Sequence, residues 1–465
     1  MTWLPLKTSI TIAAFLAIAA LPEFVPLLAN YKIVDWKSLD SVLDFHAKNI
    51  PSQAEAEQAR LNPDAPLYSD SIYPLLDPGA SLDHFYEALR QTEMRADGAV
   101  TRILHYGDSP TTADLITADL RILLQKQFGD AGHGYVLVAK PWAWYGHRGF
   151  EISNSGWQIT PANQSEVRNG LFGLGGVVFR GSPGSMSRLS ARDTDYTRVE
   201  IAYLHEPSGG LFEVLADGKL LGEIDTNYPQ IISGFTSFPI PPESKRFEIR
   251  VKSGNPRLFG AHFSKPGPGI IYNSLGVNGA YVAILSRMFQ ERHWSEQLQH
   301  YKPDLIIVNY GTNESVYASF VDTSYKKELR EVIRRIHSAV PETSVLVMSP
   351  MDRGERLPTG EIASVPALVR LVNLQQQIAA DTGCGFFNTF QAMGGPGTMG
   401  RWYNAEQRLV SADFIHPMPG GAKLVGNLLY RALTNGYNKY KMRRMQERLA
   451  AAGPIDQKVK AAAAR

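Results

Sequence analysis

The spacing of hydrophobic residues predicts a helix over residues 81–95, where Phe85, Leu89 and Met94 recur at helical intervals after the potential capping residue Ser81. Residues 100–106 (VTRILHY) then form a predicted strand, and residues 113–128 a second helix. The alternation returns late in the chain, with strands predicted at 304–309, 343–348 and 385–388 and helices at 324–340, 365–381 and 420–433. Continuous apolar strands joined by helices predict a parallel sheet that is buried on both faces.

The region between these blocks has a different pattern. Residues 150–265 contain no convincing amphipathic helix, but carry short β-rich runs separated by Gly, Pro and Ser, at 176–180, 197–204, 211–215 and 246–251. Residues 216–219 (ADGK) lie between two apolar runs, which is a hairpin signal. We therefore predict an antiparallel β-sandwich at 150–265, inserted into an α/β domain made of residues 81–149 and 266–436.

Both ends of the chain differ from this pattern. Lys7 precedes an apolar stretch over residues 10–21, broken only by Thr11, which predicts a signal peptide or an N-terminal membrane anchor within residues 1–29. The protein is then expected in the periplasm or cell envelope, secreted or held by this segment. Residues 30–80 are predicted to be a linker. Residues 437–465 carry eight Lys and Arg against two acids, which predicts a basic tail: a solvated helix or, alternatively, a contact for acidic lipid or a partner.

Composition narrows the class further. With 44% hydrophobic and 20% charged residues, the 465-residue chain has ordinary globular usage, which excludes a mostly disordered or fibrous protein. The net charge of only +2 gives no overall field of the kind that marks a nucleic-acid binder. Cys384 is the only cysteine, so intrachain disulfides and Cys-rich zinc sites are excluded.

Candidate chemistry begins where the first predicted strand ends, at Gly107-Asp108-Ser109. Ligands of parallel sheets bind at the carboxyl ends of strands, although such a tripeptide is also an ordinary loop. A serine nucleophile needs a base, and Asp413-x-x-His416 supplies an imidazole with a carboxylate three residues earlier. The same spacing also suits a metal-ligand pair or a surface turn, but no HExxH motif or acidic cluster accompanies it. His105 is a rival base, yet it lies within a predicted strand.

Two further segments could stabilise an oxyanion. Asn313, in residues 310–314 (YGTNE), follows the strand DLIIVN and can aim its amide group at a developing negative charge. Residues 273–280 (NSLGVNGA) contain Gly276 and Gly279, as expected where backbone must approach a ligand closely.

These four segments, in this order, resemble the signature blocks of the SGNH (GDSL-like) hydrolases, with Pro110 where the family name implies Leu. The resemblance implies a flavodoxin-like three-layer α/β/α fold and a serine esterase without metal or organic cofactor. It implies Ser109 as nucleophile, His416 as general base and Asp413 as its orienting partner. The implied oxyanion hole consists of the backbone N–H groups of Ser109 and Gly279 and the side chain of Asn313, with Gly276 the weaker candidate.

The sandwich and residues 120–136 (LRILLQKQFGDAGHGYV) are similar to bacterial peptidoglycan O-acetylesterases, in which a carbohydrate-binding-module-like domain interrupts the hydrolase. The resemblance implies removal of O-acetyl groups from a cell-envelope polysaccharide through an acyl-serine intermediate. Trp142, Trp144 and Tyr145, near the predicted domain junction, could stack on sugar rings or pack the junction. The alternatives are a polysaccharide O-acetyltransferase working with a membrane-bound acyltransferase, a lipase or lysophospholipase, and a non-catalytic glycan-binding protein.

Overall fold

The computed structural model describes residues 73–164 and 169–451. The predicted signal or anchor segment (1–29), the predicted linker up to residue 72 and the end of the predicted basic tail (452–465) lie outside the described residues. Within the described ranges, none of the helices combines the length and apolar character needed to cross a bilayer.

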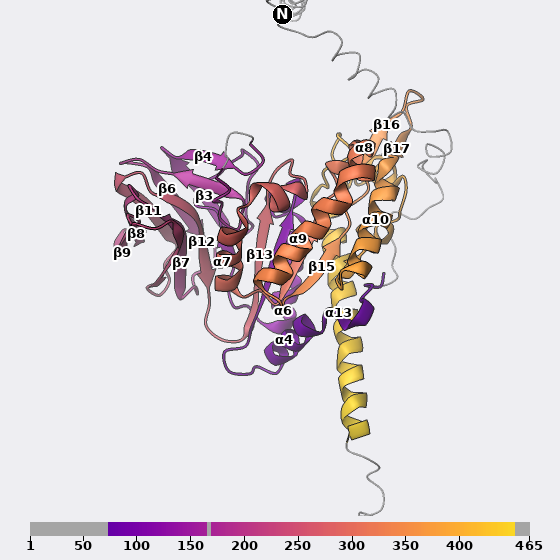
Figure 1. Cartoon of the computed structure of the whole chain (residues 1–465), viewed down its shortest axis with the longest axis horizontal. Helices are drawn as coiled ribbons and strands as arrows, with labels where there is room; N and C mark the ends of the chain where they lie inside the picture. Colours follow the sequence, from indigo (N-terminus) through magenta and orange to yellow (C-terminus); the bar gives the residue numbers. More distant parts are fainter. Residues whose placement is uncertain (1–72, 165–168, 452–465) are drawn as a thin grey trace, which may run out of the picture. The chain divides into compact units, whose positions relative to one another are not determined.

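The centre of the fold is a parallel sheet of five strands (Figure 1). In spatial order they are β13 (Gly269–Gly276), β1 (Val100–Gly107), β14 (Leu305–Asn309), β15 (Ser344–Met348) and β18 (Gly385–Phe387). Numbered along the chain this is the order 2-1-3-4-5 of flavodoxin-like folds, as the resemblance implies. Gly107 at the end of β1 pairs with both Gly276 and Asn309, so three strands end at the same edge.

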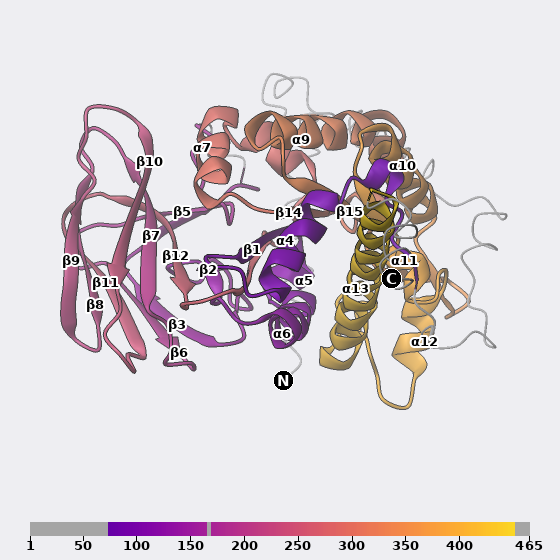
Figure 2. The same ribbon diagram turned by 90° about the horizontal axis from the view of Figure 1, so that it is seen from below.

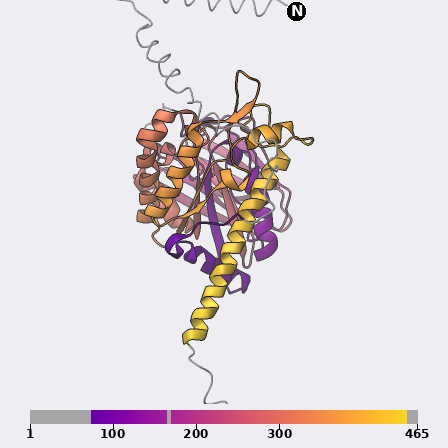
Figure 3. The ribbon, with the colours of Figure 1, turned by 90° about the vertical axis from the view of Figure 1, so that its right-hand side faces the viewer.

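Alternate strand residues face two different helix layers, which explains why the strands read as continuous apolar runs. Ile307 and Leu346 belong to a core shared with helices α4, α6 and α13, whereas Ile306 and Val345 belong to a core shared with α9 and α10. The two layers lie on opposite sides of the sheet (Figure 3). The helices are α4 (Asp83–Glu93), α6 (Ile116–Phe128), α13 (Pro419–Ala451), α9 (Lys326–Ala339) and α10 (Ala367–Asp381).

Apart from β16 (Gly354–Arg356) and β17 (Ile362–Ser364), which pair with each other, the remaining strands form two antiparallel sheets, and these confirm the predicted β-sandwich (Figure 2). One sheet contains β10 (Ile232–Pro239), β7 (Arg198–His205), β12 (Arg257–Ser264), β5 (Val177–Arg180), β4 (Gln158–Pro161) and, paired with β12, β2 (Gly134–Val136). The other contains β3 (Phe150–Ser155), β6 (Met186–Ala191), β11 (Arg246–Gly254), β8 (Gly210–Ala216) and β9 (Lys219–Asp225). The predicted hairpin joins β8 to β9: Asp217 and Gly218 both have positive φ, as a two-residue turn requires.

The division between the sandwich and the α/β domain is less sharp than predicted. Strand β2 falls within residues 81–149, yet it pairs with β12 of the sandwich. Phe172 of the insert contacts Phe289, and its carbonyl accepts a hydrogen bond from Gln297 of α7 (Glu291–Tyr301). One hydrophobic core therefore runs from the sandwich into the α/β domain.

Two predicted boundaries and one predicted helix cap also change. Residues 437–451 continue α13, which agrees with the helical alternative for the basic tail, but Tyr437 and Tyr440 are buried against Tyr86 of α4, so this helix is not solvated from residue 437 onward. The last residues of the predicted linker belong to the fold, since Leu76 pairs with Phe386 of β18. Ser81 does not cap α4: its hydroxyl donates to Asp77, which also accepts the N–H of Leu82.

Candidate active site

A hydrogen-bonded chain of three side chains lies at the carboxyl edge of the sheet. Ser109 lies two residues after Gly107, the last residue of β1, and begins the short helix α5 (Ser109–Thr112). It is only 8% exposed. His416 Nε2 lies 2.9 Å from Ser109 Oγ, and His416 Nδ1 lies 2.6 Å from Asp413 Oδ2. The structure thus brings together the three residues for which the sequence predicts catalytic roles.

The Asp413 carboxylate also organises the turn that carries His416. Its Oδ1 atom accepts hydrogen bonds from the backbone N–H groups of Ile415 and His416, at 2.9 and 3.0 Å, and from the hydroxyl of Ser411. Partial burial opposes ionisation of Asp413, but these hydrogen bonds and the one from His416 hold its pKa well below the ordinary value. Asp413 is therefore ionised and can orient the imidazole with Nδ1 as donor and Nε2 facing the serine.

Besides the backbone N–H of Ser109, the predicted oxyanion donors come from two neighbouring segments. Residues 277–283, which we call the oxyanion loop, connect β13 to η3 (Ile284–Met288) and contain Gly279. Asn313 follows β14 and donates one amide hydrogen from Nδ2 to the carbonyl of Ala280, at 2.9 Å, and among the described residues its second amide hydrogen has no acceptor. The structure brings Asn313 against the loop that carries Gly279.

The two glycines near this edge meet different constraints. Gly279 has φ of +66°, and a Cβ placed there would find only Asn163 Nδ2, at 4.0 Å. A Cβ on Gly276 would lie 2.1 Å from the backbone nitrogen of Thr112 in α5. Glycine is thus required at position 276 because β13 packs closely against α5. At position 279 glycine is favoured by the positive φ, and the space beside it is open. This difference favours Gly279 as the ligand-facing residue.

Two buried acids behind the site were not singled out from the sequence. Burial raises the pKa of Asp108 to about 6, against an opposing hydrogen bond from Thr312, and burial raises the pKa of Glu314 to about 8. Arg353 donates a hydrogen bond to the carbonyl of Thr312, the residue before Asn313, at 2.9 Å. The only sequence signal was adjacency, since Asp108 precedes Ser109 and Glu314 follows Asn313.

The three predicted sugar-stacking residues are separated by the structure. Tyr145 is only 4% exposed and its hydroxyl accepts the N–H of Leu137, so its ring packs the core and cannot stack on a sugar. Trp142 is partly buried against the same core. Trp144 is 56% exposed, and its Nε1 donates to the side chain of Asn278, the residue before Gly279.

A second aromatic contact with the oxyanion loop was missed by the sequence reasoning. The rings of Tyr281 and Tyr317 lie 6.2 Å apart, and Tyr317 is 41% exposed. Exposed aromatic residues therefore contact the loop both before and after Gly279 in sequence. Spacing alone gave no signal, because Tyr317 lies outside the four motifs.

His105, the rival base, is buried within β1 with Nδ1 2.6 Å from the Tyr272 hydroxyl. Burial lowers its pKa to about 4. His105 is therefore paired with Tyr272 in the core, and the histidine within hydrogen-bond distance of Ser109 is His416.

One group of metal-capable side chains occurs among the described residues: Asp114, His133 and His147, whose ligand atoms all lie within 4.8 Å of one another. Their donors are already engaged by the protein. Arg121 binds both carboxylate oxygens of Asp114, at 3.1 and 2.6 Å, and His133 Nε2 lies 3.0 Å from His147 Nδ1. A cation at this position would face the Arg121 guanidinium, so we interpret the group as a buried network that ties α6 and the turn before it to the sandwich.

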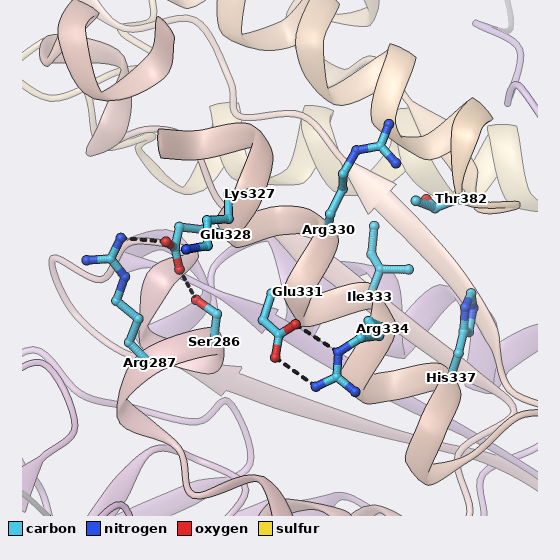
Figure 4. Close-up of a pocket in the computed structure, with 10 residues that line it drawn as sticks. All are labelled: Ser286, Arg287, Lys327, Glu328, Arg330, Glu331, Ile333, Arg334, His337 and Thr382. Atoms are coloured by element: carbon cyan, nitrogen blue, oxygen red, sulfur yellow. Dashed lines mark hydrogen bonds and ion pairs between the residues drawn. The ribbon is translucent and has the colours of Figure 1, made fainter. Parts of the chain in front are cut away.

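An open pocket of about 750 Å³ lies over α9 (Figure 4). Its walls are ion pairs, among them Arg287 with Glu328 and Arg334 with Glu331. None of the triad or predicted oxyanion residues lines it. Its lining carries four Lys and Arg side chains against two Glu side chains, and it is separate from the candidate active site.

The sheet order and the side chains at its edge define an SGNH-type hydrolase fold, and comparisons with known proteins agree. Residues 247–424 match the GDSL-like Lipase/Acylhydrolase family. A structure described as a peptidoglycan O-acetylesterase in action has a TM-score of 0.66 at 23% identity, covering 78% of this chain and 99% of that one. Together the match over residues 247–424 and the fold support an ester hydrolase of the GDSL-like (SGNH) class.

Two further solved structures have lower TM-scores. A putative GDSL-like lipase from Parabacteroides merdae has a TM-score of 0.28 at 20% identity, covering 36% of this chain and 72% of that one. A family two carbohydrate esterase from Clostridium thermocellum, in complex with cellohexaose, has a TM-score of 0.26 at 12% identity, covering 62% and 100%. A search of curated proteins found no match.

Proposed function

We propose that this protein is a serine esterase that removes O-acetyl groups from a cell-envelope polysaccharide of the peptidoglycan type. The observation that carries the proposal is the hydrogen-bonded chain from Asp413 through His416 to Ser109. The similarity to a peptidoglycan O-acetylesterase supports the substrate class, because it covers 78% of the chain and therefore extends beyond the hydrolase motifs.

The geometry suggests a two-step reaction. His416 Nε2 accepts the proton of Ser109 as Oγ attacks the acetyl carbonyl, and Asp413 stabilises the imidazolium that forms. The backbone N–H groups of Ser109 and Gly279 and the free amide hydrogen of Asn313 bind the tetrahedral oxyanion. The C–O bond to the sugar then breaks, and His416 returns its proton to the sugar oxygen. Water, deprotonated by His416, attacks the acetyl-Ser109 ester; the bond between the acyl carbon and Oγ breaks, His416 returns the proton to Ser109 Oγ, and the acetyl group leaves as acetate.

In this proposal, two exposed aromatic residues beside the oxyanion loop, Trp144 and Tyr317, bind the sugar chain. Trp144 is fixed by its hydrogen bond to Asn278, and Tyr317 by its ring contact with Tyr281. Aromatic faces of this kind stack on the apolar faces of sugars. Both contacts lie within two residues of Gly279, so a bound sugar would be held close to the oxyanion hole.

The test is acetate release from O-acetylated peptidoglycan, compared with the same material after mild alkaline de-O-acetylation and with the Ser109→Ala variant. We expect acetate only from the acetylated polymer and the unmodified protein. A parallel reaction supplies nitrophenyl acetate and the de-O-acetylated polymer. Formation of acetylated glycan without release of acetate would show an O-acetyltransferase and not an esterase. Activity confined to esters of long acyl chains would show a lipase.

We propose further that the protein acts in the periplasm or cell envelope. The support is the apolar stretch at residues 10–21 behind Lys7, which lies outside the described residues. Fractionation of cells that express the full chain tests this location. Recovery in the cytosolic fraction alone would contradict it.

A further inference from the structure

The segment after β14 holds the oxyanion loop at two points. Asn313 Nδ2 donates to the carbonyl of Ala280 at 2.9 Å, and the N–H of Val282 donates to Glu314 Oε1 at 2.6 Å. These contacts lie one and three residues after Gly279. Glu314 therefore fixes the far end of the loop whose Gly279 N–H is the proposed oxyanion donor.

The Glu314 carboxyl lies in an environment that suits a neutral acid. The residue is 0% exposed, and Oε2 has no hydrogen-bond partner among the described residues. The titratable groups around it are another buried acid and three tyrosines: Asp108 before α5, Tyr310 after β14, Tyr281 of the oxyanion loop, and Tyr325 of η5 (Val321–Tyr325). The pKa of Glu314 is raised to about 8, mainly by burial and partly by the Asp108 charge, against the opposing effect of backbone hydrogen bonds such as that from Val282. At neutral pH the carboxyl is mostly protonated.

We propose that Glu314 is a positioning residue: its neutral carboxyl anchors the oxyanion loop through Val282, and its ionisation in alkaline solution lowers the rate of ester hydrolysis. The inference rests on the proposed function of the same site. An ionised Glu314 would place a buried negative charge beside the loop that must stabilise the oxyanion. The Glu314 carboxylate and the oxyanion would then repel each other in a region of low dielectric, and this repulsion would raise the free energy of the transition state.

The test compares pH profiles of kcat and KM for nitrophenyl acetate, corrected for spontaneous hydrolysis, between pH 5.5 and 9.5. The wild-type kcat is expected to fall above pH 8. Glu314→Gln keeps an oxygen acceptor for Val282 but cannot ionise, so its alkaline fall should disappear. Glu314→Ala removes the anchor and should lower kcat at pH 7 about tenfold with little change in KM, a loss that the Gln variant restores.

Glu328→Gln is the matched control, because Glu328 is also buried but is paired with Arg287 and Ser286. It should keep the wild-type alkaline fall. Equal alkaline falls in wild type and Glu314→Gln would overturn the inference, and so would full kcat in a folded Glu314→Ala variant. If the Ala variant does not fold, the Gln profile decides alone. Wild-type turnover by Ser109→Ala would instead overturn the proposed function itself, so the two failures are distinguishable.

Discussion

His416 Nε2 lies 2.9 Å from Ser109 Oγ, although 307 residues separate the two in sequence. The sheet order explains how they meet. Ser109 follows β1, which lies between β13 and β14 at the point where the strand order reverses. His416 precedes α13, which packs beside α6, the second helix after β1. The contact therefore depends on the docking of the last helix against the first βα unit.

The role of Asp413 is testable without disturbing the shape of the turn. Asp413→Asn keeps an oxygen that can accept the backbone N–H groups of Ile415 and His416, but it loses the charge that stabilises the imidazolium. We expect kcat to fall by about 10³–10⁴-fold with the melting temperature nearly unchanged. Hydrolysis of nitrophenyl acetate measures kcat, and thermal denaturation measures the melting temperature. Ser411→Ala, which removes only one hydrogen bond to Asp413, should cost less than tenfold.

The two glycines at the sheet edge should respond oppositely to alanine. Gly276→Ala places a Cβ 2.1 Å from the Thr112 nitrogen, so it should lower the melting temperature or prevent folding. Gly279→Ala meets open space but strains a residue with φ of +66°, which costs about 1 kcal/mol and displaces the proposed donor. It should lower kcat at least tenfold in a folded protein. Thermal melts and kcat values decide, and the reverse pattern would assign the oxyanion hole to Gly276.

The sugar-binding proposal separates Trp144 from Tyr145. Trp144→Ala removes an exposed ring, so activity on acetylated polymer should fall about tenfold while turnover of nitrophenyl acetate stays within about twofold. Tyr145→Ala removes a buried ring and should lower the melting temperature by several degrees. The ratio of polymer to small-ester activity is the measured quantity. An unchanged ratio in Trp144→Ala would remove this residue from the substrate site.

Glu314 also predicts a pH dependence of stability. Its pKa is raised from 4.5 to about 8 in the folded protein, so between these values the folded state keeps a proton that the unfolded chain has released. The stability of the wild type should therefore fall as pH rises from about 4.5 through 8, relative to Glu314→Gln. Melting temperatures of the two proteins, measured at pH 5, 7 and 9, test this. A constant difference between them would mean that Glu314 ionises normally.

Much of the fold and site followed from the sequence because local pattern encodes it. Buried strands gave continuous apolar runs, and Ser109, Asn313 and His416 each occupy a turn at the sheet edge. Burial in three dimensions was not encoded in this way: Tyr145 and Trp144 are neighbours, yet one packs the core and the other is exposed. The pairing of β2 with β12 joins segments more than a hundred residues apart, and no local signal predicts it.

The central claim is that Ser109 is the nucleophile of an ester hydrolase. Its most direct test measures hydrolysis of nitrophenyl acetate by the purified wild type and by Ser109→Ala, with circular dichroism to verify folding. The account predicts a loss of several orders of magnitude in kcat in the folded variant, and a mass increase of one acetyl group on the Ser109 peptide of rapidly quenched wild type. Unchanged turnover by folded Ser109→Ala, or an acetyl group on a different residue, would contradict it.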